Sequence, residues 1–273
     1  PSWATNASSH KDDDAWCGGP FKKAKDAIVY GYKEGQENIT RFEKQISAGV
    51  KKIETALSDD TYHDIDGALV DVPMFLDDEP ECMIQVAQWP DQPSIIKIFL
   101  PASAPWTVSS EQLSRRGAAV AAMIDALERR NIRCEVMSVE VCWSSHGWGD
   151  EKNPFMHCVQ IKDPGEPLSI DRLAGTVAET WWLRRILFRL LENNELLYSE
   201  NREGYGRCVM NEDIERKFMA ANLGCEPWDI YIPESMKNFE TDEKAVNFVI
   251  NQLNLHIELF KKQGHGVARG MKE

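Results

Sequence analysis

The sequence predicts an α/β protein with a mixed or largely parallel sheet, a central βαβ unit flanked by amphipathic helices, and no OB-fold. Three observations support this prediction. Residues 95–100 form a β-branched and aromatic run, and residues 133–141 alternate polar with apolar side chains, so both segments favour strands. Between them, residues 112–130 repeat apolar side chains at helical spacing, behind serines that can cap a helix. A strand, a crossover helix and a strand within about fifty residues favour parallel pairing and a right-handed connection.

The segments on either side of the βαβ unit add helices and short strands. Residues 39–57 carry apolar side chains every three or four positions, which is typical of an amphipathic helix, and Gly224 is a helix stop signal. One expected helix begins near Pro20. The others cover 39–57, 170–192, 210–223 and a last segment from Thr241 or Asp242 to 260. The expected strands are short ones between 61 and 84, then 155–161 and 228–233.

The chain divides into three parts by composition. Residues 1–57 are expected to form an N-terminal arm and helical segment, 58–260 an α/β core domain, and 261–273 a basic mobile tail. No apolar run is long enough for a membrane span, and no secretory leader is visible. The seven cysteines form no C-x-x-C pair, so we expect reduced thiols in a cytoplasm.

The charge is polarised along the chain. The net charge of −13 argues against simple coating of nucleic acid. Residues 21–57 nevertheless hold eight basic against five acidic side chains, whereas residues 58–100 hold one basic against ten acidic. A local basic face can bind phosphates although the total charge is negative.

Two loops are expected at the carboxyl ends of the parallel strands, where ligands of open α/β sheets bind. The first loop carries Trp106 and leads to Arg115 and Arg116, and the second carries Trp143 and Trp148. Exposed tryptophans stack on bases and arginines pair with phosphates, so these residues are candidate nucleic-acid contacts. The alternative is that the tryptophans cap the core beneath long loops.

Further candidate phosphate contacts are lysines outside these loops. Lys51 and Lys52 lie on the polar face of the helix expected over 39–57, and Lys261 and Lys262 begin the basic tail. The alternative for Lys51 and Lys52 is that they are merely solvated, as on most outer helix faces.

Signatures of nucleotide cofactors and of common hydrolases are absent from the sequence. There is no G-x-G-x-x-G, no G-x-x-x-x-G-K-[ST], no G-x-S-x-G and no H-E-x-x-H. We therefore expect no catalytic residue, no cofactor and no bound metal. His63 beside Asp64, Asp66 and Asp71 fits no metal-ligand spacing. A hydrolase that uses His63 or His157 with nearby acids is the least favoured alternative.

The order of strand, long helix, strand and helix resembles a von Willebrand factor A-type domain. Members that bind a divalent ion carry Asp-x-Ser-x-Ser directly after the first strand, whereas this chain has Pro101-Ala102-Ser103-Ala104-Pro105. Because the leading aspartate is missing, the resemblance implies the scaffold without metal-dependent adhesion. The alternative function is therefore a degenerate A-like protein-interaction module that does not bind nucleic acid.

Several motifs taken together resemble a family of mid-sized tailed-phage proteins. They are Ser2-Trp3, Trp16-x-Gly18-Gly19, Arg116-Gly117-Ala118-Ala119-Val120, Asp125-Ala126-Leu127-Glu128, Asp171-Arg172-Leu173-Ala174 and Arg184-Arg185-x-x-Phe188. Within that setting the chain is similar to the single-stranded-DNA-binding cofactors of the RNA polymerases that some podoviruses encode. The resemblance implies a non-enzymatic protein of the host cytoplasm that binds single-stranded DNA and recruits the phage RNA polymerase. It transfers no individual DNA-contact residue, and a homo-oligomer is a further expected assembly.

Overall fold

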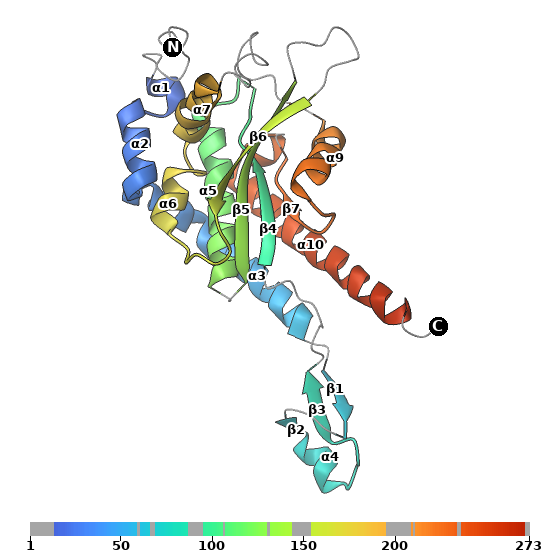
Figure 1. The fold of residues 1–273 in the computed structure, drawn as a ribbon. Helices are drawn as coiled ribbons and strands as arrows, with labels where there is room; N and C mark the ends of the chain where they lie inside the picture. Colours follow the sequence, from blue (N-terminus) through green and yellow to red (C-terminus); the bar gives the residue numbers. More distant parts are fainter. Residues whose placement is uncertain are drawn as a thin grey trace.

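A computed structural model describes the backbone of residues 14–58, 61–65, 69–86, 95–105, 107–129, 132–143, 154–194, 209, 211–233 and 236–270. Within these ranges the side chains of 49–58, 61–62, 69, 85–86, 257 and 260–270 are not described. The main sheet has four strands in the order β6-β5-β4-β7 (Figure 1). These strands are β4 (Ile95–Pro101), β5 (Arg133–Trp143), β6 (Pro154–Lys162) and β7 (Ile230–Tyr231).

The predicted βαβ unit and the α/β fold class are confirmed. β4 pairs with β5 in parallel, and the helix α5 (Ser110–Glu128) connects them. Ser109 and Gln112 form a capping box at the start of α5, which fixes where the helix begins. β7 also runs parallel to β4, whereas β6 runs antiparallel to β5, so the sheet is mixed.

Helices cover both faces of the main sheet because β5 alternates its side chains between two apolar cores. Cys134 and Val136 face the larger core, which contains α5 and parts of α3 (Gln36–Ser58) and α10 (Asp242–Gly270). Val139 and Val141 face the smaller core, which contains Met219 of α9 (Glu212–Leu223). The result is a three-layer arrangement with the sheet in the middle (Figure 1).

The sequence predicted one continuous helix over 170–192. This prediction is wrong, because the helix is interrupted. The structure has α6 (Ile170–Gly175), a turn, a π-helical segment η4 (Trp182–Leu187) and α7 (Phe188–Asn193). Thr176 leaves helical geometry with ψ −95°, and its hydroxyl donates to the carbonyls of Arg172 and Leu173. This local competition for backbone carbonyls explains the break.

A second, smaller sheet occupies the chain between α3 and β4. Its antiparallel strands are β1 (Thr61–Asp64), β2 (Leu69–Val70) and β3 (Met83–Val86), in the order β1-β3-β2, with α4 (Val72–Leu76) between β2 and β3. We call residues 61–86 the lobe. Figure 1 shows the lobe beyond the C-terminal end of α3, away from the main sheet. The short strands predicted between 61 and 84 are present, and the division of the chain into domains stays a prediction.

The N-terminal part contains α1 (Asp14–Cys17), α2 (Phe21–Tyr30) and the 3-10 turn η3 (Lys33–Gly35), and a second 3-10 turn, η5 (Met236–Phe239), precedes α10. α10 continues to Gly270, so the segment expected as a mobile tail from 261 is helical over most of its length. None of the described helices is long and apolar enough to cross a membrane.

Candidate nucleic-acid interface

Two chain segments leave the main sheet from one edge, at the carboxyl ends of its parallel strands. β4 ends at Pro101, which pairs with Val139, and β5 continues to Trp143, which pairs with Pro154 at the start of β6. The loop after β4 and the connection from β5 to β6 therefore begin at the same edge, at the upper end of the sheet in Figure 1. We call it the carboxyl edge.

A third segment also ends at the carboxyl edge. The backbone N–H of Val209 donates to the carbonyl of Val141 at 3.1 Å, so the segment 195–208, which lies outside the described residues, leads directly to β5. Its sequence contains two tyrosines and two arginines, namely Tyr198, Tyr205, Arg202 and Arg207. Its two tyrosines were a usable signal of an aromatic contact, although its three glutamates outnumber its two arginines.

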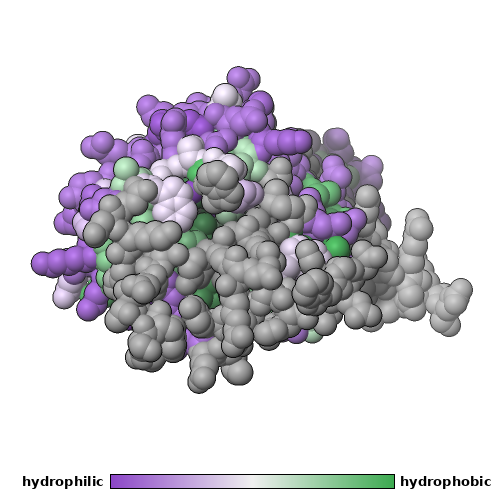
Figure 2. Space-filling view, turned by 90° about the horizontal axis from the view of Figure 1, so that it is seen from above, coloured by the Kyte–Doolittle hydropathy of each residue, from purple (hydrophilic) through white to green (hydrophobic). Residues whose placement is uncertain are grey.

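Of the three predicted stacking residues, Trp143 is the one that the structure describes. It is the last residue of β5, is half-buried, and packs against the smaller core. Trp106 and Trp148 lie outside the described residues. Figure 2 shows the molecule from above the carboxyl edge. Many of the described residues at the rim of this face are hydrophilic, and some hydrophobic residues lie nearer its centre.

Arg115 was predicted to contact phosphate, but it lies inside the protein with 9% of its surface exposed. Its guanidinium group donates to Asp242 at 2.8 Å and to the carbonyls of Phe239 and Glu240 at 2.9 and 2.8 Å. Glu111 lies within 2.5 Å of the same group. These contacts join α5 to the start of α10, so we assign Arg115 a structural role and leave it out of the interface.

Arg116 is also buried, with 5% of its surface exposed, and is left out of the interface for the same reason. It donates to the carbonyls of Ala102 and Ser103 at 3.3 and 3.5 Å, just after β4. On the other side of Trp106, the guanidinium of Arg184 donates to the carbonyl of Val108 at 2.6 Å. Two buried arginines therefore hold the backbone on both sides of the Trp106 position.

Arg184 also ties the N-terminal part to this region. It donates to the carbonyl of Trp16 at 2.5 Å, and its guanidinium carbon lies 4.2 Å from the centre of the Trp16 ring. The buried contacts were not visible in the sequence, because they join residues that are far apart along the chain.

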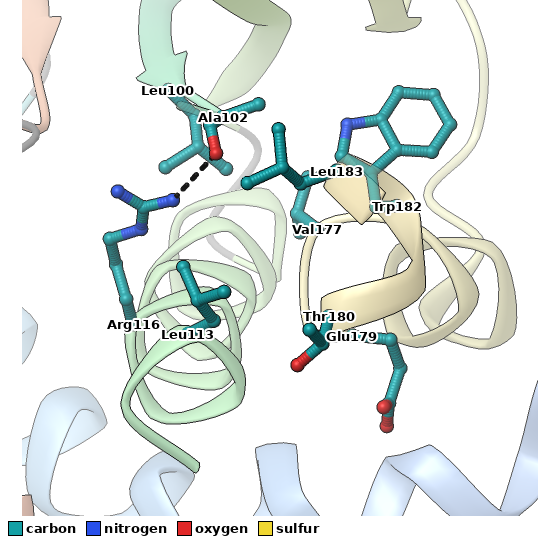
Figure 3. Close-up of a pocket in the computed structure, with 9 residues that line it drawn as sticks. All are labelled: Leu100, Ala102, Leu113, Arg116, Val177, Glu179, Thr180, Trp182 and Leu183. Carbon is teal, nitrogen blue, oxygen red and sulfur yellow. Dashed lines mark hydrogen bonds between the residues drawn. The ribbon is translucent and has the colours of Figure 1, made fainter. Parts of the chain in front are cut away.

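A small cavity lies between α5 and the turn before η4. Figure 3 shows Arg116 reaching from α5 to the carbonyl of Ala102, with Leu183 and Trp182 across the cavity. Its volume is about 20 Å³, which is room for about one water molecule and far too little for a nucleotide or a cofactor. The lining residues are Leu100, Ala102, Leu113, Arg116, Val177, Glu179, Thr180, Trp182 and Leu183.

Glu140 and His157 form a buried polar pair on neighbouring strands near the carboxyl edge. The Oε2 atom of Glu140 lies 3.2 Å from Nε2 of His157, and 2% of Glu140 is exposed. Burial raises the pKa of Glu140 to about 7 and lowers the pKa of His157 to about 4, because both charged forms lose their hydration. Cys142 donates weakly to the same carboxyl group at 3.7 Å.

This pair predicts a pH-dependent effect of Glu140→Gln. The folded protein keeps the Glu140 proton up to about pH 7, whereas the unfolded chain releases it near the ordinary pKa of 4.5. The contribution of Glu140 to stability therefore falls as the pH rises from about 4.5 to 7. Glutamine imitates the protonated carboxyl, so the variant should match the wild type at pH 5 and be more stable by roughly 2–3 kcal/mol at pH 8.

The measurement is urea unfolding of both proteins at pH 5 and pH 8. The quantity to compare is the difference in the free energy of unfolding between the variant and the wild type. The lowered pKa of His157 gives both proteins a stability contribution that rises with pH over an overlapping range, and this contribution cancels in the difference. Glu166→Gln, at an exposed turn, is the matched control and should show the same difference at both pH values. An equal effect of Glu140→Gln at pH 5 and pH 8 would contradict the assignment.

The predicted lysine contacts are not gathered at the carboxyl edge. Lys51 and Lys52 belong to the last two turns of α3, and Lys261 and Lys262 belong to the C-terminal part of α10. Their side chains are outside the described set. Figure 1 shows the C-terminal ends of both helices pointing away from the carboxyl edge. A DNA path that uses these lysines would therefore differ from one that uses the tryptophan loops.

His63 has a local structural partner in the lobe. Its Nε2 atom lies 3.0 Å from the carboxyl of Asp71, and the hydrogen bond to His63 lowers the pKa of Asp71. Asp71 also accepts a hydrogen bond from the backbone of Met74 and so caps α4. Among the described residues, no group of three or more His, Cys, Asp or Glu side chains could hold a metal ion.

Comparison with known proteins identifies one family. A family model described as a domain of unknown function (DUF7192) matches residues 2–263. No curated protein and no solved structure matches the chain.

Proposed function

The chain belongs to the family of the domain of unknown function (DUF7192), and from this starting point we propose that it is a non-enzymatic single-stranded-DNA-binding protein of a phage. In this proposal it works in the cytoplasm of the infected host, holds template strands open and recruits the phage RNA polymerase. The polymerase and the phage setting rest on the sequence resemblance alone. The DNA-binding part has support from the arrangement of the fold.

The observation that carries the proposal is the convergence of three segments at the carboxyl edge. The flanks of Trp106, the two ends of the 143–154 connection and the end of segment 195–208 all lie at this edge. Together the segments hold three tryptophans and two tyrosines, with three basic and five acidic side chains, in sequence. Aromatic side chains that stack on bases, combined with cations for the backbone, are the usual means of binding single strands without sequence preference.

Two buried arginines support the DNA-binding proposal indirectly. Arg116 and Arg184 fix the backbone on both sides of Trp106, so the loop is held at its base by the protein itself. A loop that is already preorganised loses less conformational entropy when it binds a ligand. Because the guanidinium groups of Arg115 and Arg116 are buried and hydrogen-bonded, we assign the phosphate contacts to Arg202 and Arg207 in their place.

A second candidate function is a protein-interaction module that does not bind nucleic acid. The lobe exposes several large apolar side chains, which is typical of a protein-docking surface. The segment Pro101–Pro105, where the A-type domains that the sequence resembles place metal ligands, carries no carboxylate and is mostly buried. This candidate would stand if the chain failed to bind DNA.

The proposed function predicts tight, salt-dependent binding of single-stranded DNA. Fluorescent oligo-dT and a duplex of equal length, titrated across a salt series, should show a preference for the single strand. Trp143→Ala should weaken oligo-dT binding roughly tenfold, because one stacked base contributes about 1–3 kcal/mol. The double variant Arg202→Glu with Arg207→Glu should show a shallower plot of log affinity against log salt concentration, with a slope smaller in magnitude by about 1.4.

Trp228→Ala is the matched control for Trp143→Ala. Trp228 is also half-buried but precedes the start of β7, at the opposite edge of the sheet, and its contact to His256 is made by its backbone carbonyl. This variant should bind oligo-dT like the wild type. No binding at low salt, or equal loss in both tryptophan variants, would overturn the assignment of the interface.

A further inference from the structure

The outer face of α2 carries exposed apolar and basic side chains together. Lys22, Lys25 and Val29 lie three or four positions apart and so share one side of the helix, opposite the buried Ala24 and Ala27. Val29 is 53% exposed, and the adjoining Tyr30 is 82% exposed. Lys22 and Lys25 form no ion pair with any described residue. We call Lys22, Lys25, Val29 and Tyr30 the α2 patch.

The lobe carries exposed apolar side chains together with acidic side chains. Val72, Phe75 and Leu76 lie on one side of α4, and their exposed fractions are 57%, 60% and 74%. Asp77 and Asp78 follow directly, with Glu79 after them, and none of these three acids pairs with a described cation. The lobe contains no Lys or Arg at all. We call these six residues the lobe patch.

We propose that the lobe patch of one copy of this chain docks onto the α2 patch of a second copy. The apolar centres would leave water together, and the aspartates would face the lysines across the contact. This inference does not depend on DNA binding, because neither patch belongs to the carboxyl edge. It gives the protein a head-to-tail mode of self-association, which can propagate along a chain of copies or close into a ring.

Charge selects this pairing over the other ways of joining two copies. A contact between two lobe patches would place aspartates against aspartates, and a contact between two α2 patches would place lysines against lysines. Asp26 is also exposed on this side of α2 and lowers its net charge to +1, from Lys22 and Lys25 against Asp26. The mixed pairing with the three acids of the lobe is therefore the one with a net attraction. Each patch is small, so a single contact should be weak and reversible, with a dissociation constant in the micromolar range or above.

The test is sedimentation velocity of the full chain without DNA, over a range of concentrations in 50 and 500 mM salt. The average mass should rise with concentration, and it should rise less in high salt because the charged groups are screened. Phe75→Ser with Leu76→Ser should weaken self-association at least tenfold, as should Lys22→Glu with Lys25→Glu. Lys217→Glu with Lys237→Glu makes the same charge change at other exposed lysines and should leave self-association intact.

Mixing the two defective variants distinguishes this contact from any other. The lobe variant keeps an intact α2 patch, and the α2 variant keeps an intact lobe patch, so the two should form a complex of one copy each and grow no further. Both variants carry surface changes only, and circular dichroism checks that they are folded. A wild type that stays monomeric at several hundred micromolar in low salt overturns the proposal. So does a mixture that remains monomeric, or a lobe variant that self-associates like the wild type, as it would if another surface joined the copies.

Discussion

Gly117→Ala is expected to abolish stable folding, or to lower the free energy of unfolding by more than about 4 kcal/mol. A Cβ atom at position 117 would lie 1.7 Å from the carbonyl oxygen of Val177 and 2.6 Å from the Cα of Ala178. Both neighbours are backbone atoms of the turn that interrupts the helix after α6, so no side chain can rotate away. The measurement is the yield of folded protein and its urea unfolding curve.

The direction of this effect is opposite to what helix propensity predicts. Alanine stabilises the middle of a helix by about 1 kcal/mol relative to glycine. At position 117 the close approach of two backbones outweighs that gain. Gly224→Ala is the matched control: its φ is +62°, but a Cβ atom there would meet nothing within 4 Å, so only the left-handed conformation costs energy, about 1 kcal/mol. Equal stability of the two variants would show that α5 does not pack as described.

Arg184→Ala is expected to lower the free energy of unfolding by about 3–5 kcal/mol. The change removes the donors that satisfy the carbonyls of Trp16 and Val108, and it takes away the cation stacked on the Trp16 ring. Buried carbonyls that lose their donors cost roughly 1–3 kcal/mol each. Thermal and urea unfolding measure the loss.

Arg129→Ala provides the comparison for Arg184→Ala. Arg129 is paired with Asp125 at 2.6 Å, but 64% of its side chain is exposed, so its loss should cost less than about 1 kcal/mol. Arg184→Lys should fall between the two, since lysine keeps the charge but cannot reach both carbonyls with a planar fork. If Arg184→Ala were no more destabilising than Arg129→Ala, the clamp on the loop would not matter for stability.

The parts of the fold that depend on local pattern were predictable. The βαβ unit followed from the alternation of residues 133–141 and the helical spacing of 112–130, and the structure places a parallel strand pair and α5 there. The left-handed Gly224 at the end of α9 was also visible as a stop signal. These features depend on neighbouring residues, which a single sequence displays directly.

Features that depend on distant contacts were not predictable. Arg115 and Arg116 have the same residue type as exposed phosphate contacts, and only the approach of residues 102–103 and 239–242 makes them buried donors. The break at Thr176 lacks a proline, and its close packing with α5 lies some sixty residues away along the chain. The position of Val209 beside β5 depends on its hydrogen bond to Val141, which is 68 residues away along the chain.

The pairing of β4 with β7 has a consequence for synthesis of the chain on the ribosome. Ile98 pairs with Ile230, and the larger core is closed by Leu253 of α10, so the sheet stays incomplete long after the β5–β6 hairpin has emerged. At about 5–20 residues per second, the roughly ninety residues after β6 take on the order of 5–20 s to make. During that interval the nascent chain exposes the apolar sheet surface that α9 later covers and the apolar faces of α3 and α5 that α10 later covers. We therefore expect its yield in a cell to depend on the supply of chaperones.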